Sequence, residues 1–196
     1  MPEHGCAAVI LAAGASTRLG RAKQLVPVSG EPLLSRTARL AREAGCDPVI
    51  IVLGFEAEEM RAALADAPVQ FVENEEWRSG MGSSLRRGVA ALYGLDPCPS
   101  DAMVLVCDQI ALTAEFLCEL RHVHARGERP ITASHYSGRA GVPAIFAAQY
   151  FPELLRAEGD RGARGILEQH PEDVTSVEFT AGVKDLDTPE QLRELL

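Results

Sequence analysis

Residues 11–23 read LAAGASTRLGRAK and follow an apolar run, residues 7–11, that predicts a buried strand. The stretch combines Gly14 and Gly20 with three cations. Glycines let backbone N–H groups approach an anion closely because no Cβ intervenes, and cations supply the balancing charge. Neither G-x-x-x-x-G-K-[ST] nor G-x-G-x-x-G occurs in this turn, so two common phosphate loops are excluded. The sequence therefore predicts a different loop that binds a triphosphate.

Strand and helix patterns alternate along the rest of the chain. This alternation predicts a single-domain α/β fold over residues 1–196, a three-layer α/β/α sandwich with a mostly parallel sheet. Ligands of such sheets bind at the carboxyl ends of the strands. The expected strands are 7–13, 48–53, 69–72, 102–107, 131–134, 142–147 and 175–179, and the expected helices are 31–44, 57–64, 83–92, 113–124, 163–170 and 189–196.

Composition excludes several classes of protein. The net charge of −9 argues against a nucleic-acid partner, since such proteins usually carry a basic surface. No apolar run approaches twenty residues, so we expect no membrane span. The N-terminal MPEHGC lacks a signal-peptide pattern, and the five cysteines form no C-x-x-C pair, so we expect a cytoplasmic protein with reduced thiols. The five histidines show no paired ligand spacing.

A carboxylate follows the apolar strand in VLVCDQ, residues 104–109. Asp108 therefore lies at the edge of the sheet where ligands bind. Mg²⁺ prefers oxygen ligands and typically takes one or two carboxylates together with phosphate oxygens. The alternative role, a cap for the next helix, fits Thr113 better. The sequence thus predicts Asp108 as a magnesium ligand, whereas Cys107 before it reads as a small core residue.

A second carboxylate is available in VKDLDTP, residues 183–189. Asp187 could complete a two-carboxylate metal site, but Asp-Thr-Pro-Glu is also a good helix start. The residues alone support a metal ligand and a helix start equally well.

The segment NEEWRSGMGSS, residues 74–84, leads into a helix. Small residues and hydroxyls at a helix N-terminus can bind an anion or a polar base edge, although Ser83 and Ser84 could also be caps. Trp77 could stack on a ring, but core packing is the favoured use of a lone tryptophan. Arg86 and Arg87 could add positive charge to the site, although a solvated helix face is slightly favoured.

These motifs together resemble a known family. Residues 11–23 resemble the signature L-A-[AG]-G-x-[SG]-x-R-[ML]-G-x-x-K of nucleotide-sugar-type nucleotidyltransferases. Combined with N-x-x-W-x-x-G-M-x-S-S at 74–84, the chain resembles the molybdenum cofactor cytidylyltransferases. The related guanylyltransferases usually carry L-A-G-G, so Ala13 points to cytosine. Further matches are Y-x-G-x-x-G-x-P-x-x-F at 136–146, G-D-R-G-A-R at 159–164 and D-L-D-T-P at 185–189.

The resemblance implies a nucleotide-diphospho-sugar transferase-like fold and transfer of CMP from CTP to a molybdopterin-type cofactor. It also implies Mg²⁺ on Asp108 and Asp187, catalysis by Lys23, Arg18 and Asp108, and a molybdoenzyme or its chaperone as a further partner. The nucleotide residues it implies are Leu11, Ala12, Ala13, Gly14, Ser16, Arg18, Lys23, Gly80, Ser83 and Ser84. The acceptor residues it implies are Gln109, Tyr136, Gly141, Pro143 and Arg164.

One residue departs from the family pattern. Ile110 stands where the family usually has proline after Asp-Gln, which puts the acceptor in question. Three alternatives therefore stay open: guanylyl transfer in the same pathway, cytidylyl transfer to a sugar or isoprenoid phosphate, and a non-catalytic cofactor-binding module.

Overall fold

The computed structural model describes residues 5–17 and 19–183 of the 196-residue chain. Arg18, Asp187 and the expected helix at 189–196 lie outside the described residues. No helix within the described part of the chain is long and apolar enough to cross a membrane.

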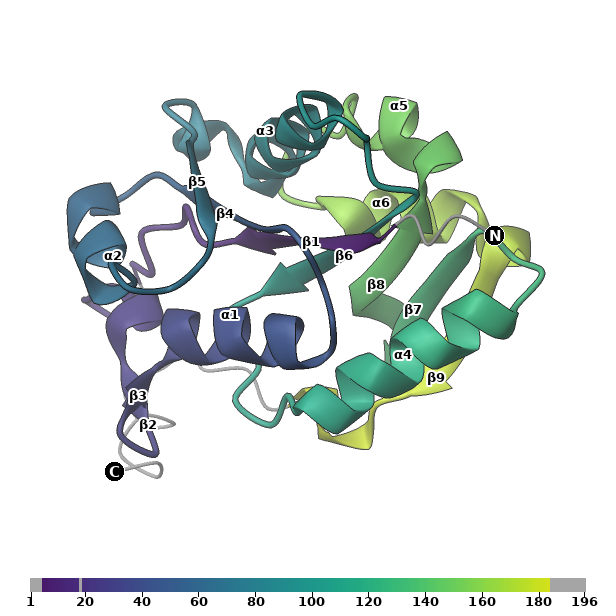
Figure 1. The fold of residues 1–196 in the computed structure, drawn as a ribbon, viewed down its shortest axis with the longest axis horizontal. Helices are drawn as coiled ribbons and strands as arrows, with labels where there is room; N and C mark the ends of the chain where they lie inside the picture. Colours follow the sequence, from purple (N-terminus) through teal and green to yellow (C-terminus); the bar gives the residue numbers. More distant parts are fainter. Residues whose placement is uncertain (1–4, 18, 184–196) are drawn as a thin grey trace.

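A seven-stranded sheet in the order β5-β4-β1-β6-β8-β7-β9 forms the middle of the molecule (Figure 1). Four of its pairings are parallel, and only β8 runs antiparallel to both of its neighbours. The predicted α/β fold with a mostly parallel sheet is confirmed. The strands are β1 Cys6–Leu11, β4 Val49–Leu53, β5 Gln70–Glu73, β6 Asp101–Val106, β7 Ile131–Tyr136, β8 Arg139–Ala147 and β9 Val174–Glu178.

Helices cover both faces of this sheet, α1 and α4 on one side and α3, α5 and α6 on the other (Figure 1). Every residue of β1 and of β4 is buried, which explains their continuous apolar runs. Alternate residues of β1 serve different layers, since Ile10 packs in one core and Val9 in the other. The α-helices are α1 Leu33–Glu43, α2 Ala57–Ala63, α3 Met81–Tyr93, α4 Ala114–Arg126, α5 Phe151–Leu154 and α6 Ala163–Gln169.

Most of the expected elements exist with shifted ends. Thr113 caps α4 as predicted, because its side chain accepts a hydrogen bond of 3.2 Å from the Phe116 N–H. The turn of Ser137 and Gly138, with φ of 51° and 72°, joins β7 and β8 into a hairpin longer than expected. Within residues 5–17 and 19–183 there are also five short 3₁₀ helices: η1 Lys23–Leu25, η2 Trp77–Ser79, η3 Ala148–Tyr150, η4 Pro171–Asp173 and η5 Thr180–Val183.

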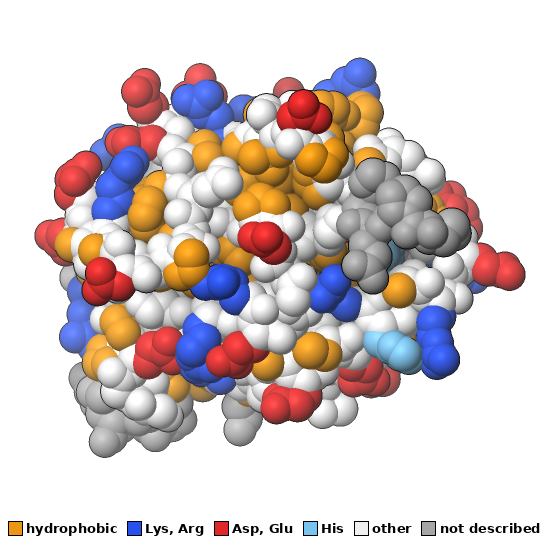
Figure 2. Space-filling model, viewed as in Figure 1, with side chains coloured by type: hydrophobic (Ala, Val, Ile, Leu, Met, Phe, Trp, Pro, Cys, Tyr) orange, Lys and Arg blue, Asp and Glu red, His pale blue; other side chains and the backbone are white. Residues whose placement is uncertain are grey.

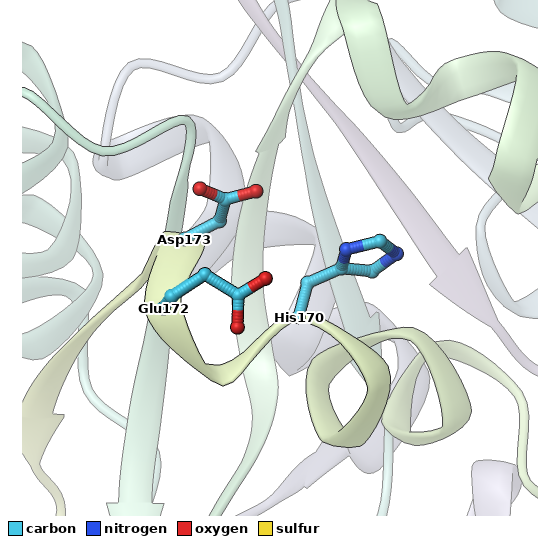
Figure 3. A group of neighbouring side chains, drawn as sticks. All are labelled: His170, Glu172 and Asp173. Carbon is cyan, nitrogen blue, oxygen red and sulfur yellow. The ribbon is translucent and has the colours of Figure 1, made fainter.

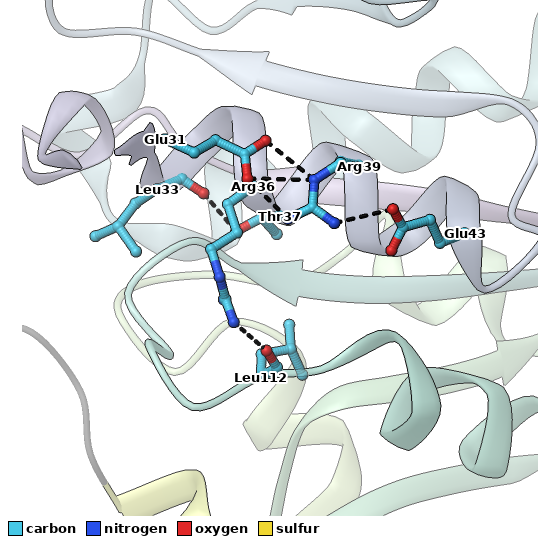
Figure 4. A network of polar contacts seen from close by, with 7 residues as sticks. All are labelled: Glu31, Leu33, Arg36, Thr37, Arg39, Glu43 and Leu112. Atoms are coloured by element: carbon cyan, nitrogen blue, oxygen red, sulfur yellow. Dashed lines mark hydrogen bonds and ion pairs between the residues drawn. The ribbon is translucent and has the colours of Figure 1, made fainter. Parts of the chain in front are cut away.

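The expected helix 31–44 begins two residues late. Glu31–Pro32 instead form β3, which pairs with β2, Pro27–Val28, in a small hairpin. Arg39 then ties this hairpin to α1, since its guanidinium binds Glu31 at 2.7 Å and Glu43 at 2.9 Å (Figure 4). A short hairpin between a polar loop and a helix has no periodic signal in the sequence, so the pattern did not reveal it.

Charges of both signs are interspersed over the face of the molecule drawn in Figure 2. On this face the described residues therefore do not form the continuous basic surface that is typical of a polynucleotide binder.

Candidate active site

A pocket of about 660 Å³ opens at the carboxyl ends of β1 and β6. The two strands are parallel and pair Leu11 with Val106, so the loops that follow them emerge side by side. The predicted residues that line this pocket are Leu11, Ala13, Gly14, Ser16, Lys23, Gly80, Ser84 and Asp108. Ala12 and Ser83 were also predicted to contact the nucleotide, but neither is among the lining residues.

Two of the residues that line the pocket, Lys23 and Asp108, form an ion pair. The Lys23 ammonium lies 2.5 Å from Asp108 Oδ2, and both side chains are only about one-fifth exposed, at 20% and 19%. The other carboxylate oxygen, Asp108 Oδ1, is buried and has no hydrogen-bond partner among the described residues. A buried carboxylate oxygen without a donor is suited to a cation, so Asp108 fits the predicted metal role.

Cys107 precedes this carboxylate and is buried at 3% exposure. Burial raises the pKa of its thiol to about 12, and the negative charge of Asp108 acts in the same direction. The thiol therefore stays protonated at neutral pH, which fits its predicted place in the core rather than a nucleophilic role.

The loop after β1 is organised by a residue that the sequence reasoning missed. Gln24 is 1% exposed, and its amide nitrogen donates hydrogen bonds of 2.8 Å to the carbonyls of both Ala12 and Gly14. Ser16 adopts a left-handed φ of 51° in the same loop and donates to Gln24 Oε1 at 3.3 Å. A glutamine beside a lysine carries no signal of burial in the sequence, so only the structure reveals this arrangement.

A second wall of the pocket is the N-terminus of α3. Asn74, 1% exposed, donates to Ser83 Oγ at 2.8 Å and to Ser84 Oγ at 3.0 Å. Ser83 in turn donates to the carbonyl of Gly80 at 2.8 Å. Ser83 thus stabilises the start of the helix, while Ser84 reaches the pocket.

Trp77 lies in the wall of the pocket and belongs to none of the hydrophobic core clusters of the described residues. Its ring packs edge-on against Phe55 with 5.7 Å between centroids, and the Arg78 guanidinium lies 4.2 Å from the ring centre. The side chain is half-buried and also lines the pocket, so an aromatic surface faces the ligand space.

The loop 157–162, which contains the start of the G-D-R-G-A-R motif, lies beside the N-terminus of α3 and brings Asp160 to the pocket. The Gly82 N–H donates to the Gly159 carbonyl at 2.8 Å, and a Cβ on Gly80 would lie 2.6 Å from the Gly159 carbonyl carbon. The glycines therefore permit a close approach that carries Asp160 to the pocket. Arg86 supports the same loop by donating to the Ala157 carbonyl at 2.5 Å. Neither Arg86 nor Arg87 lines the pocket.

A smaller pocket of about 240 Å³ adjoins the first and shares Asp108 and Asp160 with it. The predicted acceptor residues that line it are Gln109, Tyr136, Gly141 and Arg164. Pro143 does not line it, and its carbonyl instead accepts a hydrogen bond of 2.7 Å from Ser134.

The side chains in the wall of the smaller pocket are held by hydrogen bonds and by close packing. Gln109 and Tyr136 both donate to the Val142 carbonyl, at 2.9 and 3.1 Å. A Cβ on Gly141 would lie 2.5 Å from the Tyr136 hydroxyl, so any larger residue at this position would have to displace the tyrosine ring. The departure at Ile110 leaves the loop packed, because its side chain contacts the small cluster of Leu19, Val26 and Leu33.

One group of possible metal ligands lies elsewhere. The ligand atoms of His170, Glu172 and Asp173 all lie within 4.8 Å of one another (Figure 3). These three residues lie just before β9, at the amino ends of the parallel strands β7 and β9. The two pockets lie at the carboxyl ends, so this group is on the other side of the molecule from them. His170 already contacts Glu153 at 2.9 Å, and Asp173 accepts from the Tyr150 hydroxyl.

The chain is similar to known proteins along nearly its whole length. It is 35% identical to the nicotine blue oxidoreductase of Paenarthrobacter nicotinovorans, over 96% of this chain and 95% of that protein. It is 31% identical to the bifunctional protein GlmU of Syntrophotalea carbinolica, over 96% of this chain but only 39% of the relative.

Among solved structures, Rv0371c of Mycobacterium tuberculosis H37Rv superposes with a TM-score of 0.82 at 31% identity, covering 98% of this chain and 97% of that one. A complex of Rv0371c with manganese superposes with a TM-score of 0.77 at 30% identity, covering 98% of each chain. The profile of the MobA-like NTP transferase domain matches residues 8–174. The chain therefore belongs to the family of MobA-like NTP transferase domains and is a nucleotidyltransferase of that kind.

Proposed function

We propose that this domain, residues 1–196, transfers CMP from CTP to a phosphorylated acceptor of the molybdopterin type and releases pyrophosphate. The observation that carries the proposal is the Lys23–Asp108 pair at 2.5 Å, which joins the loop after β1 to the end of β6. One cation and one carboxylate, whose buried Oδ1 has no hydrogen-bond partner in the described part of the chain, stand together where a triphosphate and a metal ion would meet.

The reaction follows from charge and position. A phosphate oxygen of the acceptor attacks the α-phosphorus of CTP, a new P–O bond forms, and the bond from the α-phosphorus to the bridging oxygen breaks. That oxygen leaves with pyrophosphate. The chain has mainly to align the two reactants and neutralise the charge that grows on the leaving group.

Residues of the larger pocket would hold the triphosphate. The proposal assigns the phosphates to the backbone of the loop at Gly14, to Lys23 and to Arg18, which lies outside the described residues. Asp108, together with Asp187 outside the described part, would hold Mg²⁺, which supplies charge stabilisation to the phosphate oxygens. The manganese complex of Rv0371c supports use of a divalent cation by a relative.

The adjoining pocket supports an anionic acceptor. Arg139, Arg161 and Arg164 line it, although the chain as a whole is acidic. Arg161 and Arg164 both pair with Glu168, whereas no ion pair of Arg139 is found among the described residues. Guanidinium groups suit phosphate because they donate in a planar fork. This pocket meets the larger one at Asp108, so an acceptor phosphate there would lie next to the triphosphate.

The choice of cytosine rests on Ala13, where related guanylyltransferases usually carry glycine. We expect the reaction to occur in the cytoplasm, with delivery of the product to a molybdoenzyme or its chaperone. The relative named as an oxidoreductase raises a different chemistry, but the turn after β1 lacks the G-x-G-x-x-G pattern of dinucleotide oxidoreductases.

The test is pyrophosphate release from CTP, GTP, ATP and UTP, each with Mg²⁺ and molybdopterin cofactor. We expect release with CTP alone. Release with GTP alone would replace the cytidylyl assignment by the guanylyl one. Binding of CTP without pyrophosphate release, under conditions where a known transferase is active, would favour the non-catalytic module. A second set of assays replaces the cofactor by a sugar phosphate or an isoprenoid phosphate. Pyrophosphate release only in these assays would change the acceptor and keep the reaction.

A further inference from the structure

Gln24 is a buried polar side chain in the wall of the larger pocket. It is 1% exposed and belongs to η1, immediately after Lys23. Its amide nitrogen donates to two backbone carbonyls on the other side of the loop, Ala12 and Gly14, both at 2.8 Å. One neutral side chain thus joins the beginning and the end of the segment that encloses the predicted triphosphate.

The two carbonyl groups, of Ala12 and Gly14, affect how well the loop can bind an anion. A carbonyl oxygen carries partial negative charge, and one that faced a triphosphate would repel it. The Gln24 amide engages both oxygens, so the loop can present N–H groups rather than carbonyls to an anion. A glutamine does this without adding a charge of its own to the site.

The oxygen of the Gln24 amide is linked through Ser16 to the backbone of Lys23. Ser16 Oγ donates to Gln24 Oε1 at 3.3 Å and accepts from the Lys23 backbone N–H at 3.2 Å. Ser16 holds a left-handed φ of 51°, which a serine rarely adopts unless its surroundings fix it. The chain Gln24–Ser16–Lys23 therefore links the shape of the loop to the place of the lysine.

We propose that Gln24 is a positioning residue, which holds the loop of residues 12–16 and the backbone of Lys23 in the conformation that binds a nucleoside triphosphate. This inference rests on the proposed function for the identity of the ligand. It goes beyond that function by assigning a role to a side chain that need not touch the substrate.

The test replaces Gln24 by methionine, which has similar length and volume but no amide. Two measurements are made on wild type and Gln24→Met: the Kd for CTP with Mg²⁺ by calorimetry, and hydrogen exchange of the amides of residues 12–25. We expect CTP binding about tenfold weaker and faster exchange within this loop. CTP binding and loop exchange equal to those of wild type would overturn the proposal.

Thr37→Val is the matched control. Thr37 is 3% exposed and donates a single side-chain hydrogen bond of 2.8 Å to the Leu33 carbonyl within α1, away from both pockets (Figure 4). It also removes a buried hydrogen bond, so its Tm should fall, but its CTP affinity should stay at the wild-type value. Equal loss of CTP affinity in both variants would reduce Gln24 to a general structural residue and refute the positioning role.

Ser16→Ala keeps the proposal testable if Gln24→Met does not fold. This exchange removes only the link between the amide and Lys23, in a loop that borders solvent. In Ser16→Ala the Gln24 amide loses its link to Lys23 but keeps its bonds to Ala12 and Gly14, so we expect faster hydrogen exchange in residues 20–25 and weaker CTP binding. Exchange and CTP binding equal to those of wild type would contradict the link.

The two proposals fail separately. If wild type binds none of the four nucleoside triphosphates, the proposed function is wrong, whatever Gln24 does. The exchange measurement still decides whether Gln24 fixes the loop, because it needs no nucleotide.

Discussion

Lys23 and Asp108 are separated by 85 positions in the chain, yet their charged atoms lie 2.5 Å apart at the point where the loop after β1 meets the end of β6. The pairing of β1 with β6 in parallel register brings the two residues to one edge of the sheet. The contact has a consequence for ligand binding. A metal ion that binds Asp108 must either share the carboxylate with the Lys23 ammonium or displace the ammonium from it. A triphosphate that binds Lys23 must attract the ammonium away from Asp108.

Replacing Asp108 by asparagine should abolish turnover. The amide keeps the size of the side chain but loses the charge that a divalent cation requires, and we expect kcat to fall by about 100-fold or more. Pyrophosphate release measures this. Asp101→Asn, at the opposite end of β6, is the control and should retain activity. Near-wild-type turnover in Asp108→Asn would remove Asp108 from the metal site.

Replacing Lys23 by methionine should change metal and nucleotide binding in opposite directions. Without the ammonium, Asp108 is open to a cation, so Mn²⁺ should bind the nucleotide-free protein more tightly. CTP should bind about tenfold more weakly, because the triphosphate loses a charge-assisted partner. Paramagnetic resonance of Mn²⁺ and calorimetry with CTP measure the two effects. If Mn²⁺ affinity stays constant, the lysine does not compete for the carboxylate.

Gly141→Ala should affect the acceptor and spare the nucleotide. The new Cβ would lie 2.5 Å from the Tyr136 hydroxyl and must displace a ring that lines the smaller pocket. We expect the KM for the acceptor to rise about tenfold while the KM for CTP is unchanged. Gly165→Ala is the control, since its Cβ would meet its nearest atom at an ordinary 3.7 Å. A rise in the KM for CTP instead would contradict the separation of the two pockets.

Asp101 should make stability depend on pH. Burial by itself raises the pKa of this carboxyl, but hydrogen bonds from His124 and Ser100 outweigh burial and hold the pKa below its ordinary value. A lowered pKa in the folded state stabilises the protein above the unfolded-state pKa, and this stabilisation is lost as pH falls through the folded-state pKa.

The measurement for Asp101 is urea unfolding of wild type and Asp101→Asn at pH 7 and at several values below pH 4. At pH 7 the variant should be less stable by about 1 to 2 kcal/mol. The difference in free energy of unfolding should shrink as the pH falls. A difference independent of pH would show that the carboxylate charge does not contribute.

Local patterns predicted most of the elements and several segments that line the larger pocket. The buried run of β1 and the glycines and cations after it are contiguous, so periodicity and spacing are enough to identify a strand and an anion-binding loop. The small hairpin of β2 and β3 was missed, because two-residue strands have no period to detect.

The sequence by itself determined the α/β fold, the loop at residues 11–23 and the position of Asp108 at the end of a strand, because each depends on residues that are neighbours in the chain. Only the tertiary structure decided that β8 runs antiparallel, that Asp160 reaches the pocket beside Gly80, and that Gln24 is buried beneath the loop. These features depend on the order of strands in the sheet and on how closely distant segments approach. Both are set by packing across the whole core, which no local pattern encodes.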